Sequence, residues 1–292
     1  MRIHGYRPQR TLARSAEVVG VGFLTGAEVR LRFLPAPPSS GVVFARTDLR
    51  PQAVLPAHVD HVTGTARRTT LGRPPGEVGL VEHVLAALAG LRIDNCRVEL
   101  DAPEPPGLDG SARGFVEALL AAGLETQPGR RPVWSVAAPV RVEHGSATLT
   151  LHPAEADELR LSYFLDYGPF TPPGRQTHTQ EITPGSFASD LAGCRTFLLQ
   201  AEAEELRRQG LGKRTTAADL LVFGPHGPID NRLRYANEPA RHKVLDLVGD
   251  LALLGADLRG HVVACRSGHP LNVELVRALQ RRLVEPRPVR AA

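Results

Sequence analysis

The stretch RHKVLDLVGDLALLG, residues 241–255, places His242, Asp246 and Asp250 four residues apart in an otherwise apolar segment. On an α-helix, residues i and i+4 lie one above the other, so these three side chains form a single stripe. Apolar residues occupy most of the remaining circumference, namely Val244, Leu245, Val248, Leu251 and Leu254. The stripe is therefore predicted to face the interior or a cleft, where a buried carboxylate needs a partner.

A structural ion pair is the simpler explanation of a His-x-x-x-Asp pattern, because such pairs also occupy buried helix faces. A second stretch, EHVLAALAG, favours a metal site, because Glu82 and His83 open another apolar helix. A catalytic zinc site takes three N or O ligands and keeps one open position, and His83, His242 and Asp246 satisfy that count. The sequence predicts one Zn²⁺ per chain, although Fe²⁺ or Co²⁺ suits the same ligands.

Two further residues could move protons beside such a metal. Glu82 lies about 100° around the helix from His83, so its carboxylate can take a proton from water. In CRSGHPLN, His269 follows a predicted strand and a glycine turn, where a histidine usually has no catalytic role. Asp250, one turn beyond Asp246, can hold His269 protonated as a general acid. A base and an acid around one metal indicate a hydrolase.

Composition limits the partners. Lys and Arg outnumber Asp and Glu by 35 to 31 without a basic run, which favours an anionic small substrate over a nucleic acid. The three cysteines, Cys96, Cys194 and Cys265, are far apart and predict neither a disulfide framework nor a thiolate metal site. No stretch of about 18 apolar residues occurs. We therefore expect a protein of the cytoplasm without a membrane span.

The two halves of the chain follow one plan. Each alternates apolar and polar residues as strands do and then reaches a helix opened by His83 or His242, followed by a strand. A further helix is expected in SARGFVEALLAAG, with Ser111 as its N-cap and Gly123 after its end. The prediction is an α+β fold of two similar sheet-on-helices domains packed face to face, with the active site at their interface.

A Pro-, Gly- and Arg-rich segment, TQPGRRP at 126–132, is interpreted as the linker between these domains. The N-terminal domain then covers residues 1–127 and the C-terminal domain residues 132–284. Residues 285–292 lack a core pattern and are predicted to form a loose tail.

Five motifs, in this order and at these separations, carry a family resemblance: VEHVLAALAGLRIDN, LDGSARGF, CRTF, RHKVLDLVGDL and SGH. The chain resembles the UDP-3-O-acyl-N-acetylglucosamine deacetylases, zinc enzymes of lipid A biosynthesis, from residue 10 to about 282. The resemblance implies hydrolysis of an N-acetyl group on a UDP-sugar lipid precursor. It also implies that His83, His242 and Asp246 bind the metal. Glu82 is then the general base and His269 the general acid, and Asp250 orients His269.

The resemblance adds two residues beside the reacting amide and one behind them. Thr196 of CRTF matches the hydroxyl that polarises the amide carbonyl and stabilises the developing oxyanion. Phe197 matches an apolar wall beside the sugar. Asp109, in the loop before the helix with Ser111, is expected to support the site without touching substrate.

Four more residues are implied to bind the nucleotide. Lys243 and Arg266 match cations that face the diphosphate. In LDYGPF, Asp166 and Tyr167 resemble the family's uracil-binding pair of an aspartate and an aromatic residue. An alternative explanation of each is ordinary surface charge or core packing.

Three departures from the family pattern concern substrate binding. GFLTG has Leu24 where the family's motif has a histidine, and Ala137 stands where a basic contact is expected. GLGKRTT puts Lys213 and Arg214 near the expected acyl entrance. An apolar passage for the acyl chain is predicted beside residues 194–224, on residues that recur at helical spacing: Phe197, Leu198, Leu206 and Leu211.

Two other functions remain open at this point. The same metal centre could serve a zinc amidohydrolase acting on a different N-acyl sugar. A metal-free protein could instead use the cleft between domains to bind a nucleotide sugar. Metal content separates the binding protein from both enzymes, and a comparison of substrates separates the two enzymes.

Overall fold

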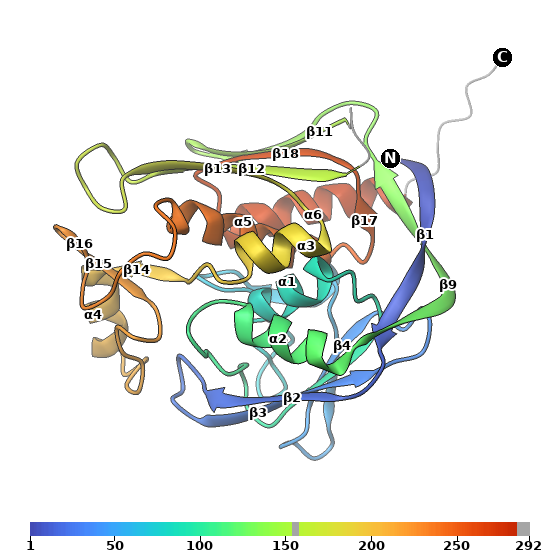
Figure 1. Cartoon of the computed structure of the whole chain (residues 1–292), viewed down its shortest axis with the longest axis horizontal. Helices are drawn as coiled ribbons and strands as arrows, with labels where there is room; N and C mark the ends of the chain where they lie inside the picture. The colour runs from blue at the N-terminus through green and yellow to red at the C-terminus, as the bar shows by residue number, and fades with distance from the viewer. Residues whose placement is uncertain (154–157, 285–292) are drawn as a thin grey trace.

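Two β-sheets enclose a double layer of helices in the computed structural model of the chain, as Figure 1 shows from the side. The structure describes residues 1–153 and 158–284. The predicted tail at 285–292 lies outside the described residues. From one sheet to the other, the order of layers is sheet, helices, helices, sheet.

The first sheet forms because its strands alternate buried apolar and exposed polar residues. In β3, for example, Val29, Leu31 and Phe33 are buried while the residues between them are exposed. The strand order is β2-β3-β8-β4-β5, and only the neighbours β8 and β4 are parallel. The bounds are β2 (Ala16–Val21), β3 (Glu28–Pro35), β4 (Val42–Arg46), β5 (Ala53–Pro56) and β8 (Cys96–Leu100), with helices α1 (Glu82–Gly90) and α2 (Arg113–Ala122) against them.

The second sheet repeats this topology. Its order is β10-β11-β18-β12-β13, again with a single parallel pair, β18 and β12. In both sheets the last strand lies between the second and the third, so the α+β fold of two similar halves is confirmed. The bounds are β10 (Val140–His144), β11 (Ala147–His152), β12 (Leu159–Asp166), β13 (Arg175–Glu181) and β18 (Gly260–Cys265), with helices α5 (Glu238–Ala252) and α6 (His269–Val284).

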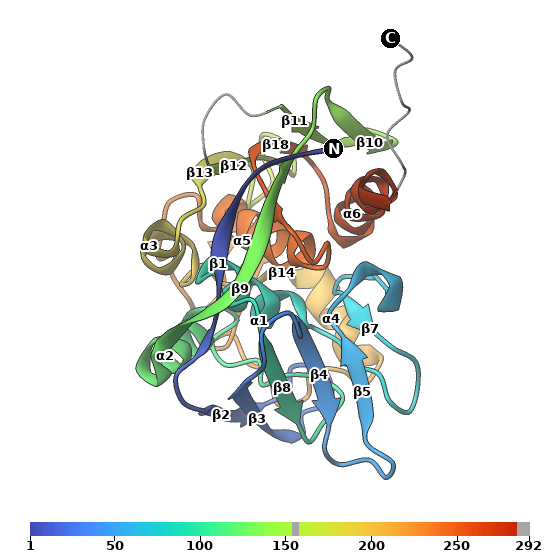
Figure 2. The ribbon, with the colours of Figure 1, turned by 90° about the vertical axis from the view of Figure 1, so that its right-hand side faces the viewer.

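A long two-stranded ribbon runs beside both halves (Figure 2). It pairs β1 (Arg2–Leu12) antiparallel with β9 (Leu124–Ser135), and the short β17 (Asp257–Leu258) joins β9 in parallel. The segment 126–132, interpreted as the linker between the domains, lies within β9. Pairing with β1 supplies the hydrogen bonds that the local Pro and Gly residues do not favour.

The helices α1 and α5 pack very closely where the two halves meet. A Cβ atom on Gly249 would lie 2.1 Å from the carbonyl oxygen of Glu82, so only glycine permits this approach. The contact joins the C-terminal part of α5 to the first residue of α1. It brings the Glu82–His83 pair to the stripe that His242 and Asp246 form.

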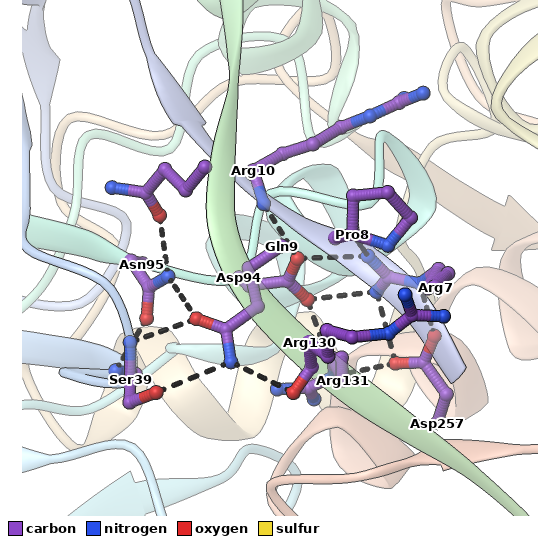
Figure 3. A network of polar contacts seen from close by, with 12 residues as sticks. Arg7, Pro8, Gln9, Arg10, Ser39, Asp94, Asn95, Arg130, Arg131 and Asp257 are labelled. Atoms are coloured by element: carbon purple, nitrogen blue, oxygen red, sulfur yellow. Dashed lines mark hydrogen bonds and ion pairs between the residues drawn. The ribbon is translucent and has the colours of Figure 1, made fainter.

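Four charged residues connect the ends of these helices on the side shown in Figure 3. Asp94 follows α1 and Asp257 follows α5, so they hold equivalent places in the two halves. Arg7 of β1 lies directly opposite Arg131 of β9 in the ribbon. The closest atoms of Arg7 and Asp94 are 2.7 Å apart, those of Arg7 and Asp257 2.5 Å, and those of Arg131 and Asp257 2.6 Å. The ribbon thus fixes the two halves to each other through a shared ion network.

Several short elements lie outside the two sheets. Residues 197–199 form a strand, so the predicted helical spacing that included Phe197 and Leu198 is wrong, while Leu206 does lie on a helix. The bounds are β6 (Val62–Gly64), β7 (Thr70–Leu71), α3 (Pro184–Ser186), β14 (Phe197–Leu199), α4 (Gln200–Arg208), β15 (Leu221–Gly224) and β16 (Gly227–Pro228), with a 3₁₀ turn at Val59–His61 and a π turn at Phe187–Leu191.

The N-terminus of α2 differs slightly from the prediction. The N-cap is Ala112 and not Ser111, although the Ser111 hydroxyl still accepts the Arg113 N–H at 3.2 Å. Asp109 accepts hydrogen bonds from the N–H and the hydroxyl of Ser111. The predicted stop at Gly123 is confirmed, since this residue follows the helix with φ of 75°.

Candidate metal centre and active site

Three predicted ligands converge from two helices. His83 stands at the start of α1, while His242 and Asp246 lie one turn apart on α5. Within residues 1–153 and 158–284 they are the one group of three or more His, Cys, Asp or Glu residues whose ligand atoms all lie within 4.8 Å of one another. The Oδ1 atom of Asp246 is 3.2 Å from Nε2 of His242 and 3.5 Å from Nε2 of His83.

The surroundings of His242 suit a metal ligand. Its Nδ1 lies 3.0 Å from the carbonyl oxygen of Cys194, and because a carbonyl only accepts, Nδ1 must carry the proton. Nε2 is then the nitrogen with a free lone pair, and it faces Asp246. Burial lowers the pKa of His242 to about 4, so the imidazole is neutral near pH 7, as coordination requires.

Asp246 is buried and ionised. Burial opposes its charge, but the neighbouring Lys243 ammonium lowers the pKa of Asp246 well below its usual value. The Lys243 ammonium donates to Oδ2 at 2.9 Å, which leaves Oδ1 on the side of the two histidines. Two neutral imidazoles and one carboxylate make a donor set that suits a divalent metal.

Glu82 is almost fully buried beside this group. Its Oε2 accepts the backbone N–H of Thr69 at 3.0 Å, and its side chain lines the adjoining cavity. Burial raises the pKa of Glu82. A carboxylate with a raised pKa is better matched to accepting a proton near neutral pH.

His269 is the first residue of α6. Its Nδ1 lies 2.8 Å from Oδ2 of Asp250, and its Nε2 is 4.0 Å from Oδ2 of Asp246. Burial alone would lower the pKa of His269, but the Asp250 and Glu82 carboxylates raise it to about 9. The imidazole is therefore protonated near pH 7 and has a proton to give.

A cavity of about 470 Å³ opens beside the three predicted ligands. Glu82, His83, Asp246 and His269 line it, together with all six residues that the resemblance implies for substrate: Thr196, Phe197, Lys243, Asp166, Tyr167 and Arg266. Ala137 is exposed and is not among the described residues that line this cavity. The structure thus brings the predicted substrate residues together around the metal group.

Phe197 forms the central part of one wall. Its ring centroid lies 5.9 Å from that of Tyr167 and 6.4 Å from that of His242, and Nζ of Lys243 lies 5.5 Å from it. Asp166 accepts from the N–H of Gly168, which lowers its pKa, and from Arg175 at 3.0 Å. The aromatic wall therefore extends from the metal group toward Asp166 and Tyr167.

A smaller, more apolar cavity of about 130 Å³ adjoins the first. Leu24, Leu206 and Leu211 line it, and Thr196 and Leu198 line both cavities. Leu24 therefore lies in the apolar cavity and is not among the described residues around the metal group. Lys213 and Arg214 were expected at the rim of this cavity but are not among the described residues that line it. The basic residues that line it are Arg67, Arg68 and Arg207.

Sequence reasoning missed three groups at the centre. Thr69 donates its hydroxyl to Asp250, Asn272 donates its amide to the same carboxylate, and the Cys194 carbonyl holds His242. Asn272 lies one turn after His269 on α6, a spacing that could have indicated it. The Cys194 carbonyl is a backbone group, so residue type gives no signal for it.

Comparison with known proteins gives a family. Residues 9–281 match the family described as "LpxC: UDP-3-O-acyl N-acetylglycosamine deacetylase". The chain belongs to this family. A UDP-3-O-acyl-N-acetylglucosamine deacetylase of Trichormus variabilis is 40% identical over 93% of this chain and 98% of its own length. One of Myxococcus xanthus is 39% identical over 95% and 87%, respectively.

A longer relative is also similar. The bifunctional enzyme LpxC/FabZ of Chlorobaculum tepidum is 38% identical over 94% of this chain. The chain spans 64% of the length of that relative. In the part of the chain that the structure describes, no helix has both the length and the apolar character needed to span a membrane.

Proposed function

We propose that the protein hydrolyses the N-acetyl group of UDP-3-O-acyl-N-acetylglucosamine and releases acetate, the committed step of lipid A biosynthesis. One observation carries this proposal. Two of the three grouped metal-ligand candidates, His83 and Asp246, line one cavity together with a buried carboxylate of raised pKa and a protonated histidine, in a chain of this family. Such an arrangement supports acyl transfer to water.

His83, His242 and Asp246 would hold the metal, and we propose Zn²⁺. The donor set fits, because Nδ1 of His242 is held by a carbonyl and Asp246 is ionised. A zinc ion held there supplies Lewis-acid chemistry toward a water and a carbonyl oxygen. Fe²⁺ accepts the same ligands, so metal analysis has to decide between them.

Two residues move protons in the proposed reaction. Glu82 takes a proton from the attacking water as the new C–O bond forms on the acetamide carbon. The Thr196 hydroxyl donates a hydrogen bond to the carbonyl oxygen as negative charge develops on it. His269 then gives its proton to the amide nitrogen as the C–N bond breaks, so acetate and the free amine leave. Asp250 holds Nδ1 of His269, so Nε2 is the nitrogen that delivers the proton.

The substrate is proposed to lie along the aromatic wall. Lys243 and Arg266 supply positive charge for the diphosphate, and Asp166 with Tyr167 receives the uracil. Phe197 packs beside the sugar. The 3-O-acyl chain enters the apolar cavity lined by Leu24, Leu206 and Leu211, because this cavity adjoins the first at Thr196.

We further propose that the enzyme works in the cytoplasm. The cysteines Cys96, Cys194 and Cys265 are free thiols, which suits a reducing compartment. No membrane-spanning helix is found among the described residues.

Metal analysis combined with acetate release tests the proposal. The purified protein should contain one metal ion per chain and release acetate from the acylated UDP-sugar. A protein that binds the UDP-sugar but neither holds metal nor releases acetate would be a binding protein instead. Equal turnover of unrelated N-acetyl sugars would identify a broader amidohydrolase.

A further inference from the structure

Thr69 contacts both proton-transfer groups of the site through different atoms. Its backbone N–H donates to Oε2 of Glu82 at 3.0 Å, and its hydroxyl lies 3.3 Å from Nδ1 of His269 and 2.6 Å from Oδ1 of Asp250. Thr69, Asp250 and Glu82 are 0%, 0% and 3% exposed, so water does not compete for these hydrogen bonds. Thr69 is not among the described residues that line the 470 Å³ cavity, so its contacts reach the substrate only through other residues.

The local chain conformation explains how Thr69 reaches this place. Thr69 directly precedes β7 in the hairpin that β7 forms with β6, and Arg67 reverses the chain before it with φ of 61°. The carbonyl of Thr69 accepts the N–H of Val81 at 3.3 Å, just before α1. The hairpin is thus attached to the N-terminus of α1, where Glu82 begins the helix.

The carboxylate of Asp250 has a different set of partners at each oxygen. Oδ1 accepts the Thr69 hydroxyl, while Oδ2 faces Nδ1 of His269 at 2.8 Å and accepts the Asn272 amide at 2.9 Å. A carboxylate with both oxygens hydrogen-bonded is held against rotation, and here the Thr69 hydroxyl holds Oδ1 while the Asn272 amide holds Oδ2. The plane of Asp250 therefore determines where His269 points.

We propose that Thr69 is a positioning residue that sets the general acid and the general base relative to each other. Its hydroxyl fixes Asp250 and through it His269, and its backbone N–H fixes Glu82. The first half of the chain thereby orients an acid that belongs to the second half, 200 residues later. This inference rests on the proposed function, in which Glu82 and His269 move protons in one reaction.

Substitution at position 69 separates the hydroxyl from the backbone. Thr69→Val keeps the shape and the N–H but removes the hydroxyl, whereas Thr69→Ser keeps the hydroxyl. We expect Thr69→Val to lose about 10-fold to 100-fold in kcat, the usual effect of removing a supporting hydrogen bond, with KM and metal content unchanged. Thr69→Ser should stay close to the wild type. Thr70→Val, at the next and only half-buried position, is the matched control and should not lose activity.

A double-mutant cycle tests the route through His269. In a His269→Ala background, Thr69→Val should cause no further loss, because the group that it positions is gone. In a Glu82→Gln background it should still reduce the residual rate by the same factor as in the wild type. If Thr69→Val folds poorly, Thr69→Ser and Thr69→Ala replace it, since both leave the same methyl-sized gap and differ only in the hydroxyl.

A second readout does not depend on turnover. The NMR signal of the His269 Nδ1 proton should be the same in the wild type and Thr69→Ser, and should shift or broaden in Thr69→Val. Three outcomes would each overturn the proposal. They are a wild-type kcat in Thr69→Val, equal losses in Thr69→Ser and Thr69→Ala, and additive losses in the His269→Ala background. A wild-type protein that releases no acetate would instead remove the proposed function, and the NMR comparison would still decide whether Thr69 orients His269.

Discussion

Gly249 lies so close to Glu82 that a Cβ atom on it would be 2.1 Å from the Glu82 carbonyl oxygen. Because the obstacle is backbone, no side-chain rotation relieves it, and one helix would have to move. The same two helices carry all three metal-ligand candidates. The distance between α1 and α5 is therefore a property on which both the stability and the metal centre depend.

Gly249→Ala should consequently lower stability and metal affinity together. Overpacking of this kind costs about 1–3 kcal/mol, and a shift of α1 moves His83 away from His242 and Asp246. Chemical denaturation and metal titration measure the two effects. Gly5→Ala is a suitable control, since a Cβ there meets nothing within 4 Å and should change neither quantity. A Gly249→Ala protein with normal metal affinity would mean that the helix spacing has no influence on the centre.

Replacing His83, His242 or Asp246 by Ala should lower metal occupancy in each case. A site with three protein ligands loses much of its affinity when one ligand is removed. Metal content of the purified variants checks this, with Lys243→Met as the comparison, because Lys243 contacts Asp246 but supplies no lone pair. Stoichiometric metal in all three Ala variants would show that the ligand assignment is wrong.

The pH dependence of kcat/KM should be a bell whose limbs come from the two proton-transfer groups. The pKa of His269 is raised to about 9, so the rate should fall as the pH rises through that value and the acid loses its proton. The pKa of Glu82 is raised by burial, so the rate should also fall on the acid side as the base becomes protonated. The two groups are coupled, so each limb belongs to the whole site.

Variants of Glu82 and His269 show which residue contributes each limb of the pH profile. Glu82→Gln and His269→Ala should each keep metal and lose on the order of 10²-fold or more in rate, the scale of general acid–base groups. Each should also lose the limb that its residue contributes. Near-normal turnover in Glu82→Gln would remove Glu82 from the mechanism.

Side-chain types and helical spacing were enough to predict that His83, His242 and Asp246 come together. The i, i+4 stripe on α5 and the Glu-His pair on α1 needed only helix geometry and the chemistry of metal ligands. The support around them was not predictable in the same way. The Cys194 carbonyl and the Thr69 N–H are backbone groups that every residue possesses, and only the tertiary structure aims them at His242 and Glu82.

In the ribbon, local composition did not indicate the secondary structure. Residues 126–132 have the composition of a turn, yet they form the middle of β9 because β1 pairs with them. Arg131 within this segment also joins the ion network with Asp257. Long-range pairing overrode local preference here. β9 begins before residue 127 and ends after residue 132, so it spans the proposed boundary. The division into residues 1–127 and 132–284 stays a prediction.

The final prediction concerns the 3-O-acyl chain. If it occupies the 130 Å³ cavity, filling that cavity should harm only acylated substrates. Leu206→Phe places a larger side chain there from α4, whereas Leu120→Phe on the half-exposed face of α2 is a control of the same chemistry. Each methylene group that no longer fits removes about 0.8 kcal/mol of transfer free energy, or roughly 4-fold in kcat/KM. Kinetics with and without the acyl chain measure this. Equal efficiency of the wild type on both substrates would mean that the cavity does not bind the chain and that a broader amidohydrolase is the better description.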